Sequence, residues 1–456
     1  MRSAPSPTLT GQPLNDQPLD GSLWAASAEP AGDYPALTGP TEADVVIVGA
    51  GYAGLSTALH LAERGLSATV LEAREPGFGG SGRSGGQVIP GLRHFASDLT
   101  AVYGEDAGRR AHAFGGGAAD ATFALIRRLG LACDARRAGW IQAADTPAAL
   151  AQSRARVEAW RGGGAPVRLL GRDEIRSLIG SEAYLGGWID PRGGTVQPLS
   201  YARSLARAAS AAGARIFARS PAMSVSRVGA AWRVETPAGV ASAPKLLLAT
   251  NATTDGLWPR LERTILPVWS FQIATRPLSP SERRYVLPAA QAVSDTRRVL
   301  RFFRLDRDGR LVVGGKGTSH GPRSPQDFNL QALALQRLYP SLDGVEIDYR
   351  WGGQVAVTVD RLPRIVDLGP GAYANLGCNG KGVAWCTAIG AAYAEAFASG
   401  DPRALPIPTS PIEPIPFHEL RRLYVGVGGA WLRFRDLIDQ SSPVADLQSQ
   451  SPKASP

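Results

Sequence analysis

One spacing of residues in the sequence could bind a nucleotide cofactor. Residues 49–54 form a G-x-G-x-x-G motif, directly after a β-branched apolar run at 45–48 and before a helical pattern. The acidic Glu72 ends the next apolar run, as the dinucleotide fingerprint requires for hydrogen bonds to the adenosine ribose. Gly51 would let a pyrophosphate approach the helix N-terminus, and the alternative is a plain strand-to-helix turn. We expect cofactor contacts from Gly49, Ala50, Gly51, Tyr52, Ala53, Gly54, Glu72, Ala73 and Arg74.

A second segment, residues 77–86, contains six glycines in ten positions. This content predicts no regular element. Its small residues and backbone N–H donors would let a flat ring and a ribityl chain pass, which favours FAD over NAD. The residues expected at the flavin are Gly79, Gly80, Ser81, Gly82, Arg83, Ser84, Gly85, Gly86 and Gln87.

A third glycine-rich segment, residues 377–382, precedes a helical pattern at 383–399. A helix N-terminus carries partial positive charge, which a reduced flavin needs where negative charge collects on its pyrimidine edge. A simple strand-to-helix turn is the alternative. The remaining expected cofactor contacts are Ala222, Thr250, Asn251, Ala252, Asn379, Gly380, Lys381, Gly382 and Val383.

The elements that must position these segments follow from hydrophobic patterning. Buried strands are predicted at 45–48, 68–71 and 246–250, with a short strand at 372–376. Strand-like runs between 267 and 315 indicate an antiparallel sheet. Ala-rich helices are predicted at 105–130, 147–160, 199–212 and 383–399.

Composition narrows the class of protein. With 44% hydrophobic and 20% charged residues, the chain of 456 residues is expected to be globular, and its 53 glycines and 35 prolines stay below a low-complexity composition. The net charge of +9 comes mostly from scattered arginines, so no nucleic-acid surface is indicated. Three cysteines and five histidines lack ligand spacing, which argues against a disulfide framework or a metal site. No signal peptide or membrane span is recognised, so we expect a cytoplasmic protein.

These motifs together resemble the FAD-dependent family that includes D-amino-acid, glycine and sarcosine oxidases, and within it the branch that contains γ-glutamylputrescine oxidoreductase. The resemblance extends from Trp24 to Leu437. The segments that carry it are 42–72, 77–87, 267–271, Arg304-Leu305, Gly314-Gly315, 351–353, 377–382 and 414–418.

The resemblance implies an α/β (α+β) fold with a Rossmann-like FAD-binding domain and a discontinuous antiparallel-sheet substrate domain. The FAD-binding domain is expected at 41–95, 195–255 and 350–400, and the substrate domain at 96–194 and 256–349. Outside them we expect an extended N-terminal arm at 1–40, a Pro-rich segment with a helix at 401–440, and a polar tail at 441–456.

The resemblance also implies a reaction. A C–H beside an amine nitrogen would give a hydride equivalent to flavin N5, and the electrons would pass to O2 or another acceptor. The expected partner is a small-molecule amine or amino acid. Some relatives bind flavin covalently through a Cys in the strand before the last glycine loop or a His in the first glycine-rich segment. Residues 353–360 contain no Cys and 77–87 no His, so we expect noncovalent FAD.

Four residues are predicted to act in catalysis. Arg301 stands where the branch usually has an acid, which would favour a carboxylate or a neutral amine over a cationic polyamine, unless its side chain points to solvent. Trp269 would form a wall of the substrate pocket or pack in the core. Lys381 could stabilise reduced flavin, and Lys316 could activate oxygen or be a solvated turn residue.

Three other functions are alternatives to this prediction. A pyridine-nucleotide reductase would need a second fingerprint after 246–251, where the chain reads Ala-Thr-Thr-Asp. A tRNA-wobble modification enzyme would be expected to carry a methyltransferase domain or a basic arm, which this sequence lacks. A flavoprotein with other redox chemistry, or one that binds FAD without turnover, stays open, as does the oligomeric state.

Overall fold

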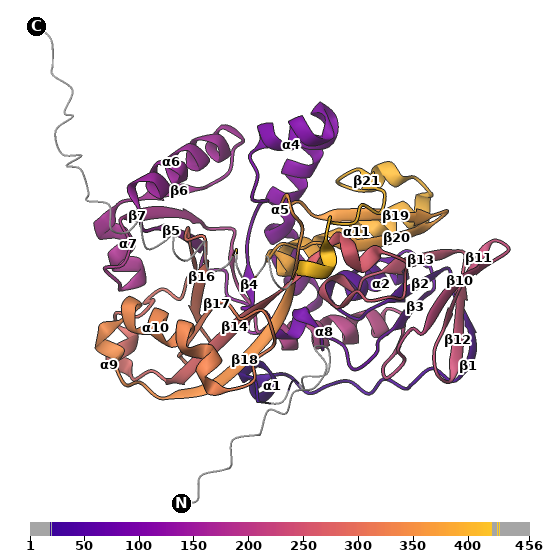
Figure 1. Cartoon of the computed structure of the whole chain (residues 1–456), viewed down its shortest axis with the longest axis horizontal. Coiled ribbons are helices and arrows are strands. Elements are labelled where there is room, and N and C mark those ends of the chain that lie inside the picture. The colour runs from indigo at the N-terminus through magenta and orange to yellow at the C-terminus, as the bar shows by residue number, and fades with distance from the viewer. Residues whose placement is uncertain (1–18, 20, 422–425, 427, 429–456) are drawn as a thin grey trace, which may run out of the picture.

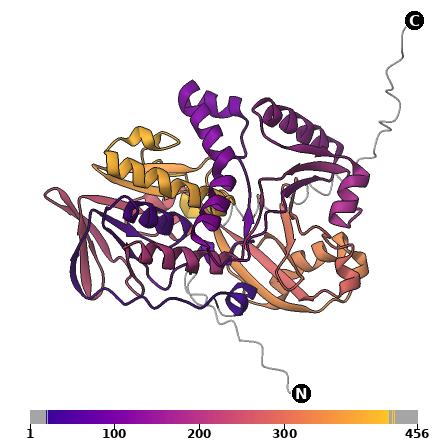
Figure 2. The same ribbon diagram turned by 180° about the vertical axis from the view of Figure 1, so that it is seen from behind.

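Two sheets lie side by side in the computed structural model, which describes residue 19, residues 21–421, and residues 426 and 428 (Figure 1). A seven-stranded sheet occupies one half and an eight-stranded sheet the other. Helix α5 (Glu105–Leu129) stands between the two halves in both views (Figures 1 and 2). The described part of the chain contains no helix long and apolar enough to cross a membrane.

The seven-stranded sheet holds the predicted parallel strands. Its order is β21-β19-β20-β13-β2-β3-β9, and only the β19–β20 pair is antiparallel. All residues of β2 and β3 are buried, as expected of parallel strands covered on both faces. The strands are β2 (Val45–Val48), β3 (Ala68–Leu71), β9 (Arg215–Phe217), β13 (Lys245–Leu248), β19 (Arg364–Gly369), β20 (Ala372–Leu376) and β21 (Thr409–Ser410).

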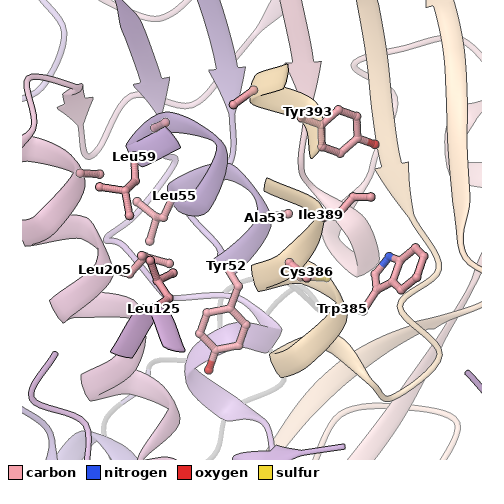
Figure 3. Close-up of a cluster of buried hydrophobic side chains, with 14 of the residues drawn as sticks. Tyr52, Ala53, Leu55, Leu59, Leu125, Leu205, Trp385, Cys386, Ile389 and Tyr393 are labelled. Atoms are coloured by element: carbon pink, nitrogen blue, oxygen red, sulfur yellow. The ribbon is translucent and has the colours of Figure 1, made fainter. Parts of the chain in front are cut away.

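Helices α2 (Tyr52–Ala62), α8 (Pro198–Ala211) and α11 (Gly382–Ser399) pack with α5 on one face of this sheet (Figure 3). Helices α2 and α11 touch closely, because a Cβ at Gly390 would lie 2.4 Å from the Ser56 hydroxyl oxygen. That hydroxyl donates a 2.7 Å hydrogen bond to the carbonyl of Thr387. The first and third glycine segments therefore lie at the N-termini of two helices in direct contact.

A four-stranded sheet covers the opposite face of the seven-stranded sheet. Its strands are β1 (Gly39–Glu42), β10 (Ser224–Val228), β11 (Ala231–Glu235) and β12 (Gly239–Ala243), in the order β1-β12-β11-β10. Alternate residues Trp232 and Val234 point inward and join a core cluster with Val46 and Leu246. The alternation of buried and more exposed side chains along β11 is typical of a strand with one covered face.

The eight-stranded sheet is antiparallel apart from the parallel β15–β5 pair, so the expected antiparallel sheet is confirmed with one exception. Strand β18 runs in this sheet, although most of it falls in the range expected for the FAD-binding domain. In spatial order the strands are β18 (Ile347–Val357), β14 (Leu266–Pro277), β17 (Arg310–Lys316), β16 (Arg301–Leu305), β15 (Ala292–Asp295), β5 (Trp140–Ala144), β7 (Gly186–Asp190) and β6 (Arg168–Leu170).

The two faces of the eight-stranded sheet have different neighbours. Helices α7 (Arg172–Ile179) and α10 (Asn329–Leu338) pack on one face through a large apolar cluster, and α9 (Pro280–Arg283) lies near them in Figure 1. On the other face, α6 (Pro147–Gly162) covers the outer strands. Contacts from the second glycine segment cover strands β18 and β14 there.

Two expectations need correction. The segment 77–86 is not devoid of regular structure, because α3 (Gly80–Arg83) makes one helical turn, in which the Ser84 amide donates to the Gly80 carbonyl. The N-terminal arm is not simply extended, because it contains α1 (Leu23–Ser27), whose Trp24 is 0% exposed. The Ser22 hydroxyl caps this short helix by accepting from the Ala25 amide, and Leu23 and Trp24 are buried in it.

Short elements complete the described chain. Strand β4 (Gln87–Val88) pairs with β8 (Gly194–Thr195), and α4 (Ala96–Tyr103) precedes α5. The helices predicted at 105–130, 147–160, 199–212 and 383–399 are confirmed within one or two residues. The helix expected near 430–438 and the polar tail lie outside the described residues.

Candidate active site

The first glycine segment forms a tight turn at the N-terminus of α2. A Cβ at Gly54 would lie 2.0 Å from the carbonyl oxygen of Gly49, so only glycine allows α2 to approach β2 this closely. The N-cap residue Gly51 offers no side-chain hydrogen bond to the helix. Amide groups at this end of α2 and its dipole can therefore meet an anion such as a pyrophosphate.

Glu72 lies at the end of β3 beside this turn. Its carboxylate accepts hydrogen bonds from the amides of Ala50 (2.9 Å) and Arg74 (3.0 Å). Burial raises the pKa of Glu72, and these amides partly offset the rise. The carboxylate is thus fixed next to the fingerprint turn, at the position from which a ribose could be recognised.

The second glycine segment connects the first to the eight-stranded sheet. The Ser81 hydroxyl accepts from the Tyr52 amide (3.1 Å), and the Tyr52 hydroxyl donates to the Ser81 carbonyl (2.6 Å). On its other side, the Arg83 carbonyl accepts from the side chains of Gln272 (2.7 Å) and Trp351 (3.1 Å). The Ser84 carbonyl accepts from the Trp24 indole at 2.8 Å, so α1 also holds this segment.

Gln87 anchors the end of the second segment in the sheet. Its side-chain amide donates to the carbonyl of Val293 (2.9 Å) and accepts from the Ser294 hydroxyl (2.8 Å). The Ser294 hydroxyl also accepts a 3.2 Å hydrogen bond from the Trp140 indole N–H. The sheet and the glycine segment are therefore joined by a buried polar network.

Two asparagines of the predicted set shape the third glycine segment. The Asn251 side chain accepts from the Gly377 amide (3.0 Å) and donates to the Cys378 sulfur (3.2 Å). The Asn379 side chain accepts from the Thr358 amide (3.0 Å) and donates to the Gly377 carbonyl (2.6 Å). Both residues therefore hold the backbone of this loop. Their amide groups are engaged with protein atoms.

Three other predicted cofactor residues have modest contacts. The Thr250 hydroxyl pairs with that of Thr254 at 2.7 Å. Ala222 packs at the edge of the core between the four- and seven-stranded sheets, and Val383 is buried in the first turn of α11. Their contact with a cofactor stays a prediction.

Arg301 and Trp269 lie on the face of the eight-stranded sheet that carries α7 and α10. On β16, Arg301 shares its face with Phe303 of the apolar cluster, and its charge interacts with Asp295, Tyr184 and Arg337. The Arg301 amide donates to the carboxylate of Asp295 at 2.9 Å. Burial raises the pKa of Asp295 to about 7. Trp269 belongs to the same apolar cluster, with its ring 6.2 Å from that of Phe271.

The opposite face carries Phe302 and Lys316. Side chains alternate along a strand, so Phe302 points away from Arg301, and its ring lies against Gly85 of the second glycine segment and Gly314 of β17. Lys316, two residues after Gly314, shares that face and lies opposite Ser270 in the ladder. The sequence alone does not identify Phe302 as a site residue, because the face that its side chain occupies depends on the register of β16.

Lys381, the N-cap residue of α11, bridges the third segment and the sheet. Its ammonium group donates to the Pro90 carbonyl (3.2 Å) and lies 5.6 Å from the centre of the Trp140 ring. Burial, with the charges of Arg156 and Arg93, lowers the pKa of Lys381 to about 7. Near neutral pH this amine can therefore both accept and donate a proton.

A cavity opens beside Lys381. Arg93 and Arg361 line it and were not predicted, because nothing in their local sequence separates them from the many other arginines. The complete lining is Leu92, Arg93, Arg361, Pro363, Cys378, Asn379, Lys381 and Trp385.

Comparison with known proteins gives consistent matches. Residues 44–396 match the DAO family, described as FAD dependent oxidoreductase. The chain is 33% identical over 423 residues to gamma-glutamylputrescine oxidoreductase of Escherichia coli K12, covering 91% of this chain and 98% of that protein. It is 32% identical over 387 residues to probable oxidoreductase OrdL of Haemophilus influenzae, covering 81% and 86%.

A solved structure with a similar fold is glycine oxidase from Geobacillus kaustophilus. The TM-score is 0.68 at 20% identity, over 80% of this chain and 96% of that one. At this identity the likeness concerns the fold alone. It agrees with a Rossmann-like half that is joined to a sheet-based half.

Proposed function

Because this chain belongs to the DAO family of FAD-dependent oxidoreductases, we propose that it oxidises the C–N bond of an amine or an N-substituted amino acid to an imine. The family resemblance and the FAD cofactor expected from the sequence are confirmed. When bound, FAD supplies at N5 the acceptor for the hydride equivalent that leaves the carbon beside the nitrogen.

One observation carries the proposal. The second and third glycine segments meet one face of the eight-stranded sheet through Trp140, Phe302 and Gln272. The first segment is joined to the second by the hydrogen bonds between Tyr52 and Ser81. The N-terminus of α2 and Glu72 suit the pyrophosphate and adenosine ribose, and the second segment suits the ribityl chain and ring. The residues present therefore fit FAD.

Lys381 would handle the substrate proton. An amine must lose its proton before the nitrogen lone pair can assist departure of the hydride, and the neutral form of Lys381 can accept that proton. The imine product then adds water and separates into a carbonyl compound and an amine. Because its pKa is lowered to about 7, Lys381 is a weaker candidate for a fixed positive charge beside the flavin than the sequence suggested.

The electrons would pass to O2 or to another acceptor, and Lys316 is the residue proposed to assist that step. Its position on the Phe302 face supports the assignment, because a cation there can stabilise negative charge that develops on reducing oxygen.

The test is a visible spectrum of the purified protein followed by anaerobic addition of amines and N-substituted amino acids. We expect a flavin band that bleaches with at least one of these compounds, and carbonyl product after turnover. A flavin band that no amine bleaches would instead support other redox chemistry or FAD binding without turnover. Absence of flavin together with NAD binding would refute the proposal.

A further inference from the structure

The sulfur atoms of Cys378 and Cys386 lie close together where the third glycine segment enters α11. A Cβ at Gly382 would stand 3.4 Å from the Cys378 sulfur and 4.0 Å from the Cys386 sulfur. The Cys386 thiol also hydrogen-bonds to the Cys378 sulfur. Neither cysteine forms a disulfide, and the proposed reaction uses neither. The two thiols are therefore neighbours that a disulfide could join.

Cys378 is the more reactive of the two. Its side chain lines the cavity beside Lys381 and is partly exposed. The Asn251 side-chain amide donates to its sulfur at 3.2 Å. The Cys386 thiol lowers the pKa of Cys378, and the N–H groups of Gly380 and Asn251 act in the same direction against the effect of burial. The thiolate is the nucleophilic form, so this sulfur can attack a small electrophile that enters the cavity.

The charges around the cavity favour the same step. Arg93, Arg361 and Lys381 line it together with Cys378, and no carboxylate is among its lining residues. Positive charge stabilises a thiolate, and it also stabilises the hydroxide that leaves when a peroxide is cleaved. The cavity therefore suits the reaction of a thiolate with a small, neutral oxidant.

Cys386 suits a second step. It is buried in α11, and its hydrogen bond with Cys378, together with burial, raises its pKa. Cys386 therefore stays protonated while Cys378 carries the negative charge. Oxidation of Cys378 removes that charge, so its effect on the pKa of Cys386 ends. The Asn375 side-chain amide, 4.0 Å from the Cys386 sulfur, is placed to stabilise the thiolate that then forms.

We propose that Cys378 and Cys386 form a peroxide-reactive thiol pair whose disulfide weakens the binding of FAD. The Cys378 thiolate attacks one oxygen of hydrogen peroxide, the O–O bond breaks, and a sulfenic acid and hydroxide form; the hydroxide takes a proton and becomes water. The Cys386 sulfur then attacks the sulfenic sulfur, loses its proton and displaces the hydroxyl group as a second water. The two sulfurs lose two electrons, and the peroxide gains them.

The disulfide acts on the cofactor site through Asn251. This side chain accepts from the Gly377 amide at 3.0 Å and donates to the Cys378 sulfur. A disulfide sulfur is neutral and a weak acceptor, so the third segment loses one of its two ties to Asn251. We expect the Kd of FAD to rise about fivefold, which corresponds to the loss of one hydrogen bond. The inference goes beyond the proposed oxidation of a C–N bond and does not depend on it.

The test is peptide mapping of the FAD-bound protein before and after addition of stoichiometric hydrogen peroxide. Trypsin cuts after Lys381, so Cys378 and Cys386 fall in separate peptides, 365–381 and 382–403. Remaining thiols are blocked with N-ethylmaleimide before digestion. We expect peroxide to join the two peptides and dithiothreitol to separate them again. Release of FAD on dilution should give the higher Kd in the oxidised protein alone.

Two variants assign the two steps. Cys386→Ser should stop the reaction at the sulfenic acid of Cys378, which dimedone captures, and should keep the Kd of FAD unchanged by peroxide. Cys378→Ser should show neither the sulfenic acid nor the disulfide. In wild type, dimedone should capture much less, because Cys386 consumes the sulfenic acid.

Asn251→Asp separates a specific role of the amide from a structural one. The carboxylate keeps an acceptor for the Gly377 amide and removes the donor to the Cys378 sulfur, so the reaction with peroxide should move to higher pH. Cys133→Ala is the matched control. Burial raises the pKa of Cys133 to about 12, so this variant should react with peroxide like the wild type.

The outcomes separate this inference from the proposed reaction. Two peptides that stay apart and fully blocked after peroxide, or a disulfide that includes Cys133, would overturn the thiol pair. A link between 365–381 and 382–403 with an unchanged Kd of FAD would overturn its effect on the cofactor. Bleaching of the flavin by amines is measured on the reduced protein, so failure of the proposed reaction leaves these results unaffected.

Discussion

Arg301 illustrates how much depends on which face of a strand a side chain occupies. It sits one residue before Phe302, yet it faces α10 and the buried Asp295 while Phe302 faces the second glycine segment. The substrate preference expected of Arg301 stays a prediction, and the orientation of its side chain toward α10 argues against it.

We expect Arg301→Gln to leave kcat/KM and the preference between acidic and neutral amines within about threefold of the wild type. The free energy of unfolding should instead fall by about 0.5–3 kcal/mol, because the substitution removes a positive charge next to Asp295. Steady-state kinetics and urea unfolding check the two parts. If Arg301→Gln lost a preference for acidic amines and kept its stability, Arg301 would face the substrate and not α10.

Lys381 should give the reaction its pH dependence. Because only the neutral amine accepts a proton, kcat/KM should rise as pH increases through about 7 and then level off. In Lys381→Met, which keeps a side chain of similar length over Trp140, this inflection should vanish and activity at pH 8 should fall about 100-fold. Flavin reduction in stopped flow is the measurement, and an unchanged profile would exclude Lys381 as the acceptor.

Lys316 should affect a different half of the catalytic cycle. In Lys316→Met we expect reduction of the flavin by substrate to be unchanged and reoxidation by O2 to slow about 100-fold. Lys316→Arg, which keeps the charge, should restore most of the rate. If both variants reoxidise like the wild type, oxygen activation does not depend on this residue.

The contact between α2 and α11 is the element-scale feature on which the cofactor site depends. Each helix begins at a glycine segment, and Gly390 sets how closely the two helices pack. The Ser56 hydroxyl has its partner on α11, so the spacing of the helices also fixes a buried hydrogen bond. Moving one helix would displace one end of the site relative to the other.

Gly390→Ala should therefore weaken FAD binding about tenfold or more and destabilise the protein by about 1–3 kcal/mol, since the added methyl group meets Ser56. Gly117→Ala is a matched control in the exposed side of α5, where no atom lies within 4 Å of the new Cβ. It should raise stability by about 0.5–1 kcal/mol. Thermal unfolding and FAD titration distinguish the two. Equal FAD affinities would argue against this coupling.

Across the whole molecule, the sequence predicted the elements better than the faces they present. The βαβ unit at 45–71 and the helix after 382 carry strong local patterns, and both are present. The sequence does not predict which face of the sheet Trp269 and Arg301 occupy, because the register of a strand depends on which neighbouring strands pair with that strand. Arg93 and Arg361 gain their meaning only from a cavity built by segments far apart in the chain.

The absence of Cys from 353–360 and of His from 77–87 leads to a prediction for the whole holoprotein. After precipitation with acid, the yellow flavin should remain in the supernatant. A pellet that keeps its colour after washing, followed by a flavin-bearing peptide on digestion, would show a covalent link and refute noncovalent binding.

The order of strands in the seven-stranded sheet has a consequence for how the protein is made. Strand β13 lies between β2, from the beginning of the chain, and β20, from near its end. While the ribosome is still translating the middle of the protein, one edge of β13 has no partner and α2 lacks α11 beside it. A nascent chain must therefore keep that edge from pairing with other chains until synthesis is almost complete. Binding of FAD can therefore stabilise the protein only after the whole polypeptide has been synthesised.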